Sequence, residues 1–200
     1  MDLPFPKETV DKIQQRINNV FEVWPEAVRN SKYFWAQSFY NQFKGASYSF
    51  LGSLHTGNYA HWPHENADQK VPGLNCTTVI TEPFILLSFF GLNPEIVQFI
   101  DFKNVYPGQK VHSYTSHFSL IVDVGRRNPY LFDPFQEVFG PILERGDGFM
   151  RVGKTGESKK FRREYKQLLV YSAQNFVDMM ERLRTPAGSL EVLSAYQRLT

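Results

Sequence analysis

The stretch Pro72-Gly73-Leu74-Asn75-Cys76-Thr77-Thr78-Val79-Ile80 contains Cys76, the only cysteine among the 200 residues. The turn residues at 72 and 73 lead into it, and an apolar segment follows as far as Gly91. This segment is too apolar for a surface helix, so we expect an element that is mostly buried. Cys76 is therefore either a nucleophile at the start of that element or a small buried hydrophobic residue.

Pro83 complicates this segment, because a proline inside a helix removes one backbone hydrogen bond and costs about 3 kcal/mol. In one arrangement the helix begins at Cys76 and kinks at Pro83, so the thiol lies at the helix N-terminus. There the helix dipole favours the thiolate, and backbone N–H groups can bind an oxyanion. In the other arrangement the helix begins only at Thr81, and Cys76 loses both advantages.

The segments after Gly91 are predicted to be strands. They are Glu95–Phe102, Val111–Val124 and Tyr130–Asp133, with a turn at 125–128. Side chains alternate between the two faces of a strand. One face of the second strand therefore carries Phe118, Leu120, Val122 and Val124, and the other carries His117, Ser119 and Ile121.

His117 and Asp133 are equally distant in sequence from the turn residue Gly125. In an antiparallel pair centred there they lie directly opposite each other, on one face of the sheet. A carboxylate in that position can hold the imidazole in one tautomer. Cys76, His117 and Asp133 then supply a nucleophile, a base and a group that orients the base. His112 is a competing base, but its parity predicts the other face.

These motifs resemble a known superfamily. A cysteine begins a buried segment, a strand follows with His117-Phe118-Ser119-Leu120-Ile121-Val122, and the next strand ends in Leu131-Phe132-Asp133-Pro134. The pattern looks like the transglutaminase-like branch of the papain-like superfamily. The intervals of 41 residues from Cys76 to His117 and 16 from His117 to Asp133 also resemble arylamine N-acetyltransferases and glutamine deamidases. The resemblance covers roughly residues 70–135.

The resemblance implies an α+β, papain-like fold in which a buried cysteine helix packs on an antiparallel sheet. It implies that the Cys76 thiolate attacks an acyl or amide carbon, that His117 transfers the proton and that Asp133 orients His117. For a further oxyanion donor it suggests a residue upstream of the cysteine, and Gln69, Trp62 and Tyr59 are the candidates. Asn75 departs from the pattern, because members of the branch commonly have glycine there.

The function expected from these residues is a thiol-dependent amide hydrolase, of the peptidase or glutamine deamidase type, or an acyltransferase. Both react through a cysteine thioester, and both act on a peptide, a protein or a small amide or acyl substrate. The alternative from another class is a papain-like binding or scaffold module that has lost the chemistry. We expect no cofactor and no metal.

Residues 148–155 fit the written phosphate-loop pattern GxxxxGK[ST], which makes a nucleotide binder the third hypothesis. No clean apolar strand precedes Gly148, and bulky Phe149 and Met150 occupy the interior of the pattern. Three other histidines, His55, His61 and His64, lack the spacing of a defined zinc site. The basic residues of 159–166 are interrupted by Glu164 and are predicted to be a solvated face.

Length and hydrophobic pattern predict one α+β domain over residues 1–200. We expect a helical scaffold over 1–52, a catalytic core over 70–171 and C-terminal helices over 173–200. The expected helices are Glu8–Val23, Ser31–Lys44 with Ser31 as its cap, Ala173–Arg184 and a short one after Pro186. A long polar loop is predicted over 52–73, and an irregular region beyond Pro134 with short strands at Phe149–Val152 and Gln167–Tyr171.

The formal charge of +2 and the isoelectric point near 8.6 predict neither a nucleic-acid nor a membrane partner. The N-terminus lacks the pattern of a signal peptide, and the apolar stretch Phe84–Leu92 is too short to cross a bilayer. A single cysteine closes no intramolecular disulfide. We therefore expect a cytoplasmic protein, with secretion by a leaderless route left open.

Overall fold

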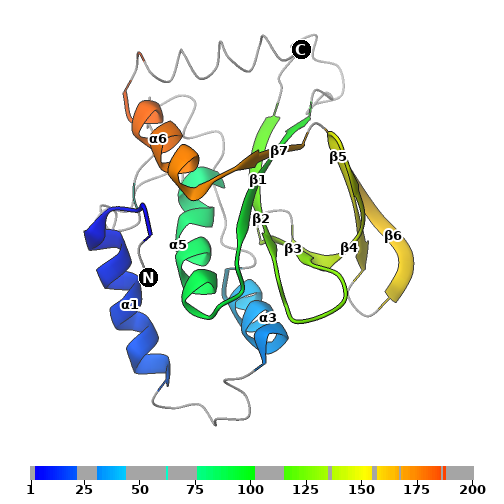
Figure 1. Ribbon diagram of the computed structural model, residues 1–200, viewed down its shortest axis with the longest axis horizontal. Helices are drawn as coiled ribbons and strands as arrows, with labels where there is room; N and C mark the ends of the chain where they lie inside the picture. The colour runs from blue at the N-terminus through cyan, green and yellow to red at the C-terminus, as the bar shows by residue number, and fades with distance from the viewer. Residues whose placement is uncertain are drawn as a thin grey trace.

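The computed structural model of the chain describes residues 3–21, 31–43, 62, 76–101, 115–134, 137–154, 157–166, 168–185 and 187. These residues form an α+β fold (Figure 1). The helices in them are α1 (Lys7–Phe21), α3 (Lys32–Phe43), α5 (Cys76–Phe89) and α6 (Ala173–Leu183). The strands are β1 (Glu95–Asp101), β2 (Thr115–Val122), β3 (Tyr130–Asp133), β4 (Val138–Gly146), β5 (Phe149–Lys154), β6 (Glu157–Lys166) and β7 (Leu168–Tyr171).

The seven strands form one sheet in the order β6-β5-β4-β3-β2-β1-β7, and neighbouring strands run antiparallel. The helices α1, α5 and α6 lie on one side of β1 and β2, while β3 to β6 curl away on the other side (Figure 1). An ion pair of 2.6 Å joins Arg145 Nη2 on β4 to Glu95 Oε1 on β1. Because β4 and β1 are not neighbours in the sheet, this pair bridges the curl.

Two hydrophobic cores lie on the two faces of this sheet. The helix-side core joins the helices to one face, and its members include Ile13, Ile17, Trp35, Phe39, Ile80, Phe84, Ile85, Leu87, Phe118, Leu120, Val122, Phe132 and Phe176. The inner core comes from strands alone and consists of Val97, Phe99, Ile121, Leu131, Val138, Ile142, Met150 and Val152. The predicted alternation along β2 is confirmed, since Phe118 and Leu120 face the helices and Ile121 faces the inner core.

Helix α5 begins at Cys76 and contains Pro83, so the arrangement in which it begins at Thr81 is wrong. The missing hydrogen bond is offset by burial, because Ile85 and Leu87 are completely inaccessible to solvent. Burying such a side chain stabilises the fold by about 1.5–3 kcal/mol. Two residues of this kind therefore match or exceed the roughly 3 kcal/mol that an internal proline costs.

The region beyond Pro134 is more regular than predicted, because β4 and β6 cross it. A glycine such as Gly140 indicates a loop in the sequence. In the structure it lies in β4, where the absence of a side chain allows β5 to approach closely. A Cβ added at Gly140 would lie 2.1 Å from the carbonyl oxygen of Gly153 on β5. Pro141, next in β4, has no N–H, and the following amide of Ile142 donates to the Pro129 carbonyl at 2.8 Å. Turn-forming residues thus lie inside a strand.

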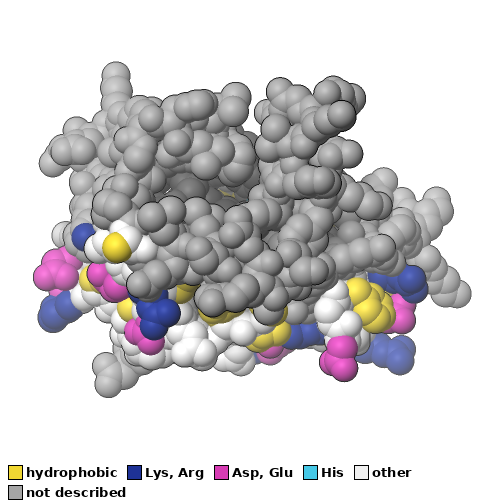
Figure 2. Space-filling model, turned by 90° about the horizontal axis from the view of Figure 1, so that it is seen from above, with side chains coloured by type: hydrophobic (Ala, Val, Ile, Leu, Met, Phe, Trp, Pro, Cys, Tyr) yellow, Lys and Arg dark blue, Asp and Glu magenta, His cyan; other side chains and the backbone are white. Residues whose placement is uncertain are grey.

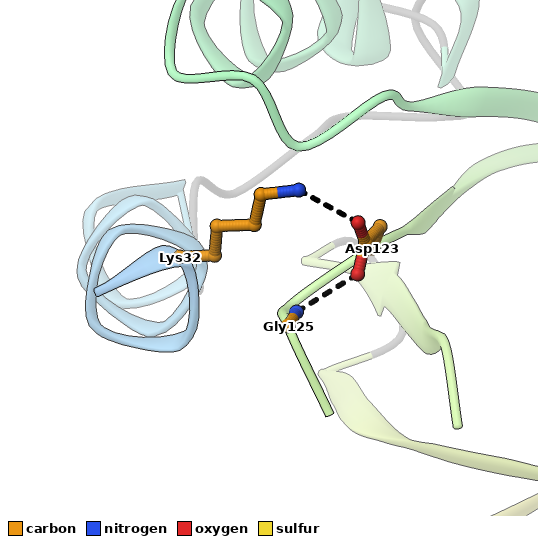
Figure 3. A network of polar contacts seen from close by, with 3 residues as sticks. All are labelled: Lys32, Asp123 and Gly125. Atoms are coloured by element: carbon orange, nitrogen blue, oxygen red, sulfur yellow. Dashed lines mark hydrogen bonds and ion pairs between the residues drawn. The ribbon is translucent and has the colours of Figure 1, made fainter. Parts of the chain in front are cut away.

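The N-terminus of α3 is attached to the end of β2 by Lys32 (Figure 3). Lys32 Nζ donates to Asp123 Oδ2 at 2.7 Å, and the backbone N–H of Gly125 donates to Asp123 Oδ1 at 2.8 Å. The predicted cap is confirmed as well, since Ser31 Oγ accepts from the N–H of Phe34 at 3.2 Å. The hydrogen bond from Lys32, followed by that from Gly125, lowers the pKa of the Asp123 carboxyl.

No helix in the described part of the chain is long and apolar enough to cross a membrane. In the view of Figure 2, acidic and basic side chains alternate along the described surface. That face therefore presents no continuous block of one charge sign among the residues described there.

The lowered pKa of Asp123 predicts a pH-dependent contribution to stability. A carboxyl whose folded-state pKa lies below its unfolded value stabilises the fold above the unfolded value, about 3.9, and loses this effect as the pH falls through the folded-state pKa. Asp123→Asn should therefore lower the melting temperature at pH 7, and the difference from the unmodified protein should disappear once the pH has fallen below the folded-state pKa of Asp123.

Thermal unfolding between neutral and acidic pH measures this difference. Asp147→Asn, in the exposed turn between β4 and β5, is the matched control and should show little difference at any pH. A difference for Asp123→Asn that stays constant across the pH range would contradict the assignment.

Candidate active site

His117 and Asp133 form a buried hydrogen-bonded pair between β2 and β3. His117 Nε2 lies 2.9 Å from Asp133 Oδ2. The two residues are 6% and 1% exposed. Since burying a charged or polar group without a partner is costly, each side chain stabilises the other in this position.

The register of β2 and β3 differs from the predicted one by two residues. Leu120 pairs with Phe132 and Val122 with Tyr130, which places Ser119 opposite Asp133. His117 is then the diagonal neighbour of Asp133, so the prediction of direct opposition is wrong. The prediction that both side chains lie on one face is confirmed by their hydrogen bond, because a shift by two residues preserves the face.

Ser119 belongs to the same cluster, a contact that the sequence did not reveal. Its Oγ lies 3.1 Å from His117 Nε2, the nitrogen that also faces Asp133. Ser119 is completely buried. The available signal was its position two residues from His117, which puts both side chains on one face of a strand.

The surroundings of this cluster are apolar. Phe99, the partner of His117 across β1 and β2, stacks on the imidazole with ring centroids 6.4 Å apart and an interplanar angle of 26°. Two inner-core residues lie near Asp133: Leu131, two residues before it on β3, and Val138, its partner on β4. Hydrogen bonds in such a low-dielectric site are stronger than in water.

Cys76 lies at the same end of the fold as His117. The short connection from α5 to β1 reverses the chain, and β1 runs antiparallel to β2, so α5 and β2 run in the same direction (Figure 1). The amide of Asp123 donates to the carbonyl of Leu92, just beyond α5, at 2.8 Å. We measure both distances from this Leu92–Asp123 contact. Cys76 lies about 20 Å from it along the helix, and His117 lies about 20 Å from it along the strand, so both are at the opposite end.

The two residues belong to elements on different sides of the sheet. Helix α5 packs on the helix-side core with Phe118 and Leu120, whereas His117 shares its face with Phe99 and Ile121 of the inner core. Strand β2 is flanked by β1 and β3. A thiol from the start of α5 therefore reaches the imidazole only around the end of the β1–β2 pair at Asp101 and Thr115. The structure describes the backbone of Cys76 but not its side chain.

Trp62 is described and does not fit the oxyanion role. Its indole Nε1–H donates to Glu181 Oε1 on α6 at 2.7 Å, its ring packs edge-on against Phe5, and it is 2% exposed. An indole has a single N–H, so this donor is already used and the expectation for Trp62 is wrong. The other two candidates, Gln69 and Tyr59, lie outside the described residues.

The phosphate-loop hypothesis for residues 148–155 is also wrong. Phe149–Lys154 is strand β5, paired with β4 on one side and β6 on the other, and Gly148 occupies the turn before it with φ +75°. A phosphate loop instead joins a strand to the N-terminus of a helix. Within the described ranges no three metal-ligating side chains cluster. The histidines at 55, 61, 64 and 112 lie outside those ranges.

No family model matches the chain. No curated protein matches it either.

The hydrogen bond between His117 and Asp133 predicts a stability difference between two variants. Asp133→Ala removes the carboxylate next to a buried imidazole and should destabilise the protein by about 1–3 kcal/mol. Asp133→Asn keeps an oxygen acceptor at similar volume and should cost less. Urea unfolding measures both values.

Asp178→Ala on α6, which removes an exposed carboxylate that accepts from Gln174, is the control and should change stability by less than about 0.5 kcal/mol. Equal costs for Asp133→Ala and Asp133→Asn would mean that packing, and not the hydrogen bond, stabilises the pair.

Proposed function

We propose that this protein is a thiol-dependent amide hydrolase or acyltransferase that reacts through a thioester on Cys76. The observation that carries the proposal is the buried hydrogen bond of 2.9 Å between His117 and Asp133. The start of α5 at Cys76, at the same end of the fold, supports it. The proposed arrangement is that of the transglutaminase-like branch of the papain-like superfamily.

Each residue of the triad has a defined role in this proposal. Asp133 faces Nε2 of His117, so Nδ1 is the nitrogen that exchanges a proton with the thiol. The helix N-terminus lowers the cost of the Cys76 thiolate and offers backbone N–H groups to an oxyanion. Asp133 stabilises the imidazolium that forms when His117 takes the thiol proton.

The reaction proceeds in two balanced steps. The thiolate adds to the carbonyl carbon, the C–N bond breaks, and the departing amine takes a proton from His117, which leaves an acyl thioester on Cys76. A second nucleophile then adds to the thioester, gives its proton to His117 and releases the acyl group from sulfur. Water as that nucleophile gives hydrolysis, and an amine gives acyl transfer.

Amide hydrolysis is the form we favour, because water needs no second binding site. The substrate class is a peptide, a protein or a small amide or acyl compound. Cys76, His117 and Asp133 serve every one of these substrates in the same way, so the triad defines the reaction and not the substrate.

A binding or scaffold module is the second candidate, and a specific observation favours it. His117 and Asp133 lie on the face of the sheet opposite α5 and are almost completely buried. In this candidate the pair is a structural link between β2 and β3, and Cys76 takes no part in it.

Alkylation of Cys76 by iodoacetamide distinguishes the two candidates. A thiol activated by the helix N-terminus and His117 should react at least about tenfold faster than free cysteine at neutral pH. His117→Ala should return the rate to that of an ordinary thiol. Mass spectrometry of the labelled protein measures both rates.

His112→Ala is the matched control, because it removes a histidine from the segment just before β2 and should leave the rate unchanged. If the alkylation rate of Cys76 depends on His112 and not on His117, His112 is the base. A slow reaction that neither variant changes would refute the enzyme and leave the binding module.

A further inference from the structure

We propose that Ser119 is a positioning residue for His117, which shares the Nε2–H proton with Asp133 and holds the imidazole in one orientation. The consequence for catalysis rests on the function proposed above, whereas the hydrogen-bond arrangement itself does not.

The two contacts converge on one ring nitrogen. His117 Nε2 lies 2.9 Å from Asp133 Oδ2 and 3.1 Å from Ser119 Oγ. Both distances fall in the range of good hydrogen bonds. Ser119 lies two residues from His117 on β2, and Asp133 lies on β3, so the ring is held from its own strand and from the neighbouring one.

Counting protons assigns the donor. A carboxylate is an acceptor only, so a proton on Nε2 makes the contact with Asp133 favourable, and Nε2 is the donor. The same proton then points toward Ser119 Oγ, which accepts it in a three-centre bond. Protonation of the imidazole adds its proton at Nδ1 and leaves Nε2–H in place. The arrangement therefore fits both charge states of His117.

The position of Ser119 supports a role for its hydroxyl. The apolar residues on this face of β1 and β2 are Val97, Phe99 and Ile121, and Val97 is the direct partner of Ser119 across the two strands. A buried strand normally favours such β-branched or aromatic side chains. A buried hydroxyl is costly unless it is hydrogen-bonded. The contact with His117 satisfies the oxygen of this hydroxyl as an acceptor.

Two hydrogen-bond partners at Nε2 restrict the orientation of the imidazole ring more than one partner does. A single hydrogen bond to Asp133 allows the imidazole to tilt about the line from Nε2 to Oδ2, which moves Nδ1. The second contact with Ser119 and the stacked ring of Phe99 oppose this tilt. In the proposed enzyme, Nδ1 then keeps one position while it gains and loses the proton.

NMR of protein labelled with ¹⁵N in histidine tests the arrangement without any assumption about activity. We expect the ring nitrogen shifts of His117 to identify Nε2 as the protonated nitrogen. Ser119→Ala should accelerate exchange of this Nε2–H with solvent by about fivefold, the size expected for one lost neutral hydrogen bond. Ser119→Thr keeps the hydroxyl and should restore slow exchange.

Ser88→Ala is the matched control. It removes another buried serine hydroxyl, which donates to the Phe84 carbonyl within α5 at 2.7 Å. It should leave the exchange of the His117 proton unchanged even where it lowers global stability. If Ser119→Ala does not fold, Ser119→Cys replaces it, because sulfur fills a similar volume and is a weak acceptor.

Unchanged exchange in Ser119→Ala, or a proton on Nδ1 instead of Nε2, would overturn the inference. The rate of Cys76 alkylation by iodoacetamide provides the second readout, and Ser119→Ala should lower it several-fold with recovery in Ser119→Thr. Faster proton exchange without any change in alkylation would support the positioning of the ring by Ser119. It would also overturn the catalytic consequence of Ser119, whereas the triad itself is tested by His117→Ala, so the two proposals fail separately.

Discussion

Strand β2 is buried on both faces, and the rest of the structure depends on this constraint. Its even-numbered residues Phe118, Leu120 and Val122 support the helices, while Ile121 and the residues of the inner core fill the curl of the sheet. A strand of this kind cannot shift by one residue without exchanging the two sets. The positions of His117, Ser119 and Asp133 on one face therefore follow from packing before any chemistry is considered.

Burial determines how these polar residues behave. In the inner core a hydroxyl, an imidazole and a carboxylate replace apolar side chains, and each would be destabilising alone. Together they form a small network that links β2 to β3, and networks of this kind are stabilising only when their groups are satisfied. A structural role and a catalytic role therefore require the same hydrogen bonds.

The sequence predicted the parts of the fold in which apolar side chains recur at regular spacing or a local signal marks the end of an element. The alternation in β2, the bounds of β3, the cap at Ser31 and the shared face of His117 and Asp133 all follow from local patterns. The register was missed by two residues because the connection from Asp123 to Pro129 is not a symmetric turn at Gly125. Strand β4 was missed because Gly140 and Pro141 indicate a loop, and only the approach of β5 explains the glycine.

The turn after α5 and the pairing of β1 with β2 determine where Cys76 lies relative to His117. The short turn after α5 and the antiparallel pairing of β1 and β2 bring Cys76 to the level of His117, whatever the conformation of the other loops. The same pairing puts β2 between the helix and the imidazole. Because Asp133 and Ser119 both contact Nε2, Nδ1 lies on the side of the ring away from Asp133. The chemistry therefore requires the thiol to approach around the end of β1 and β2, and the direction of this approach separates an enzyme from a scaffold.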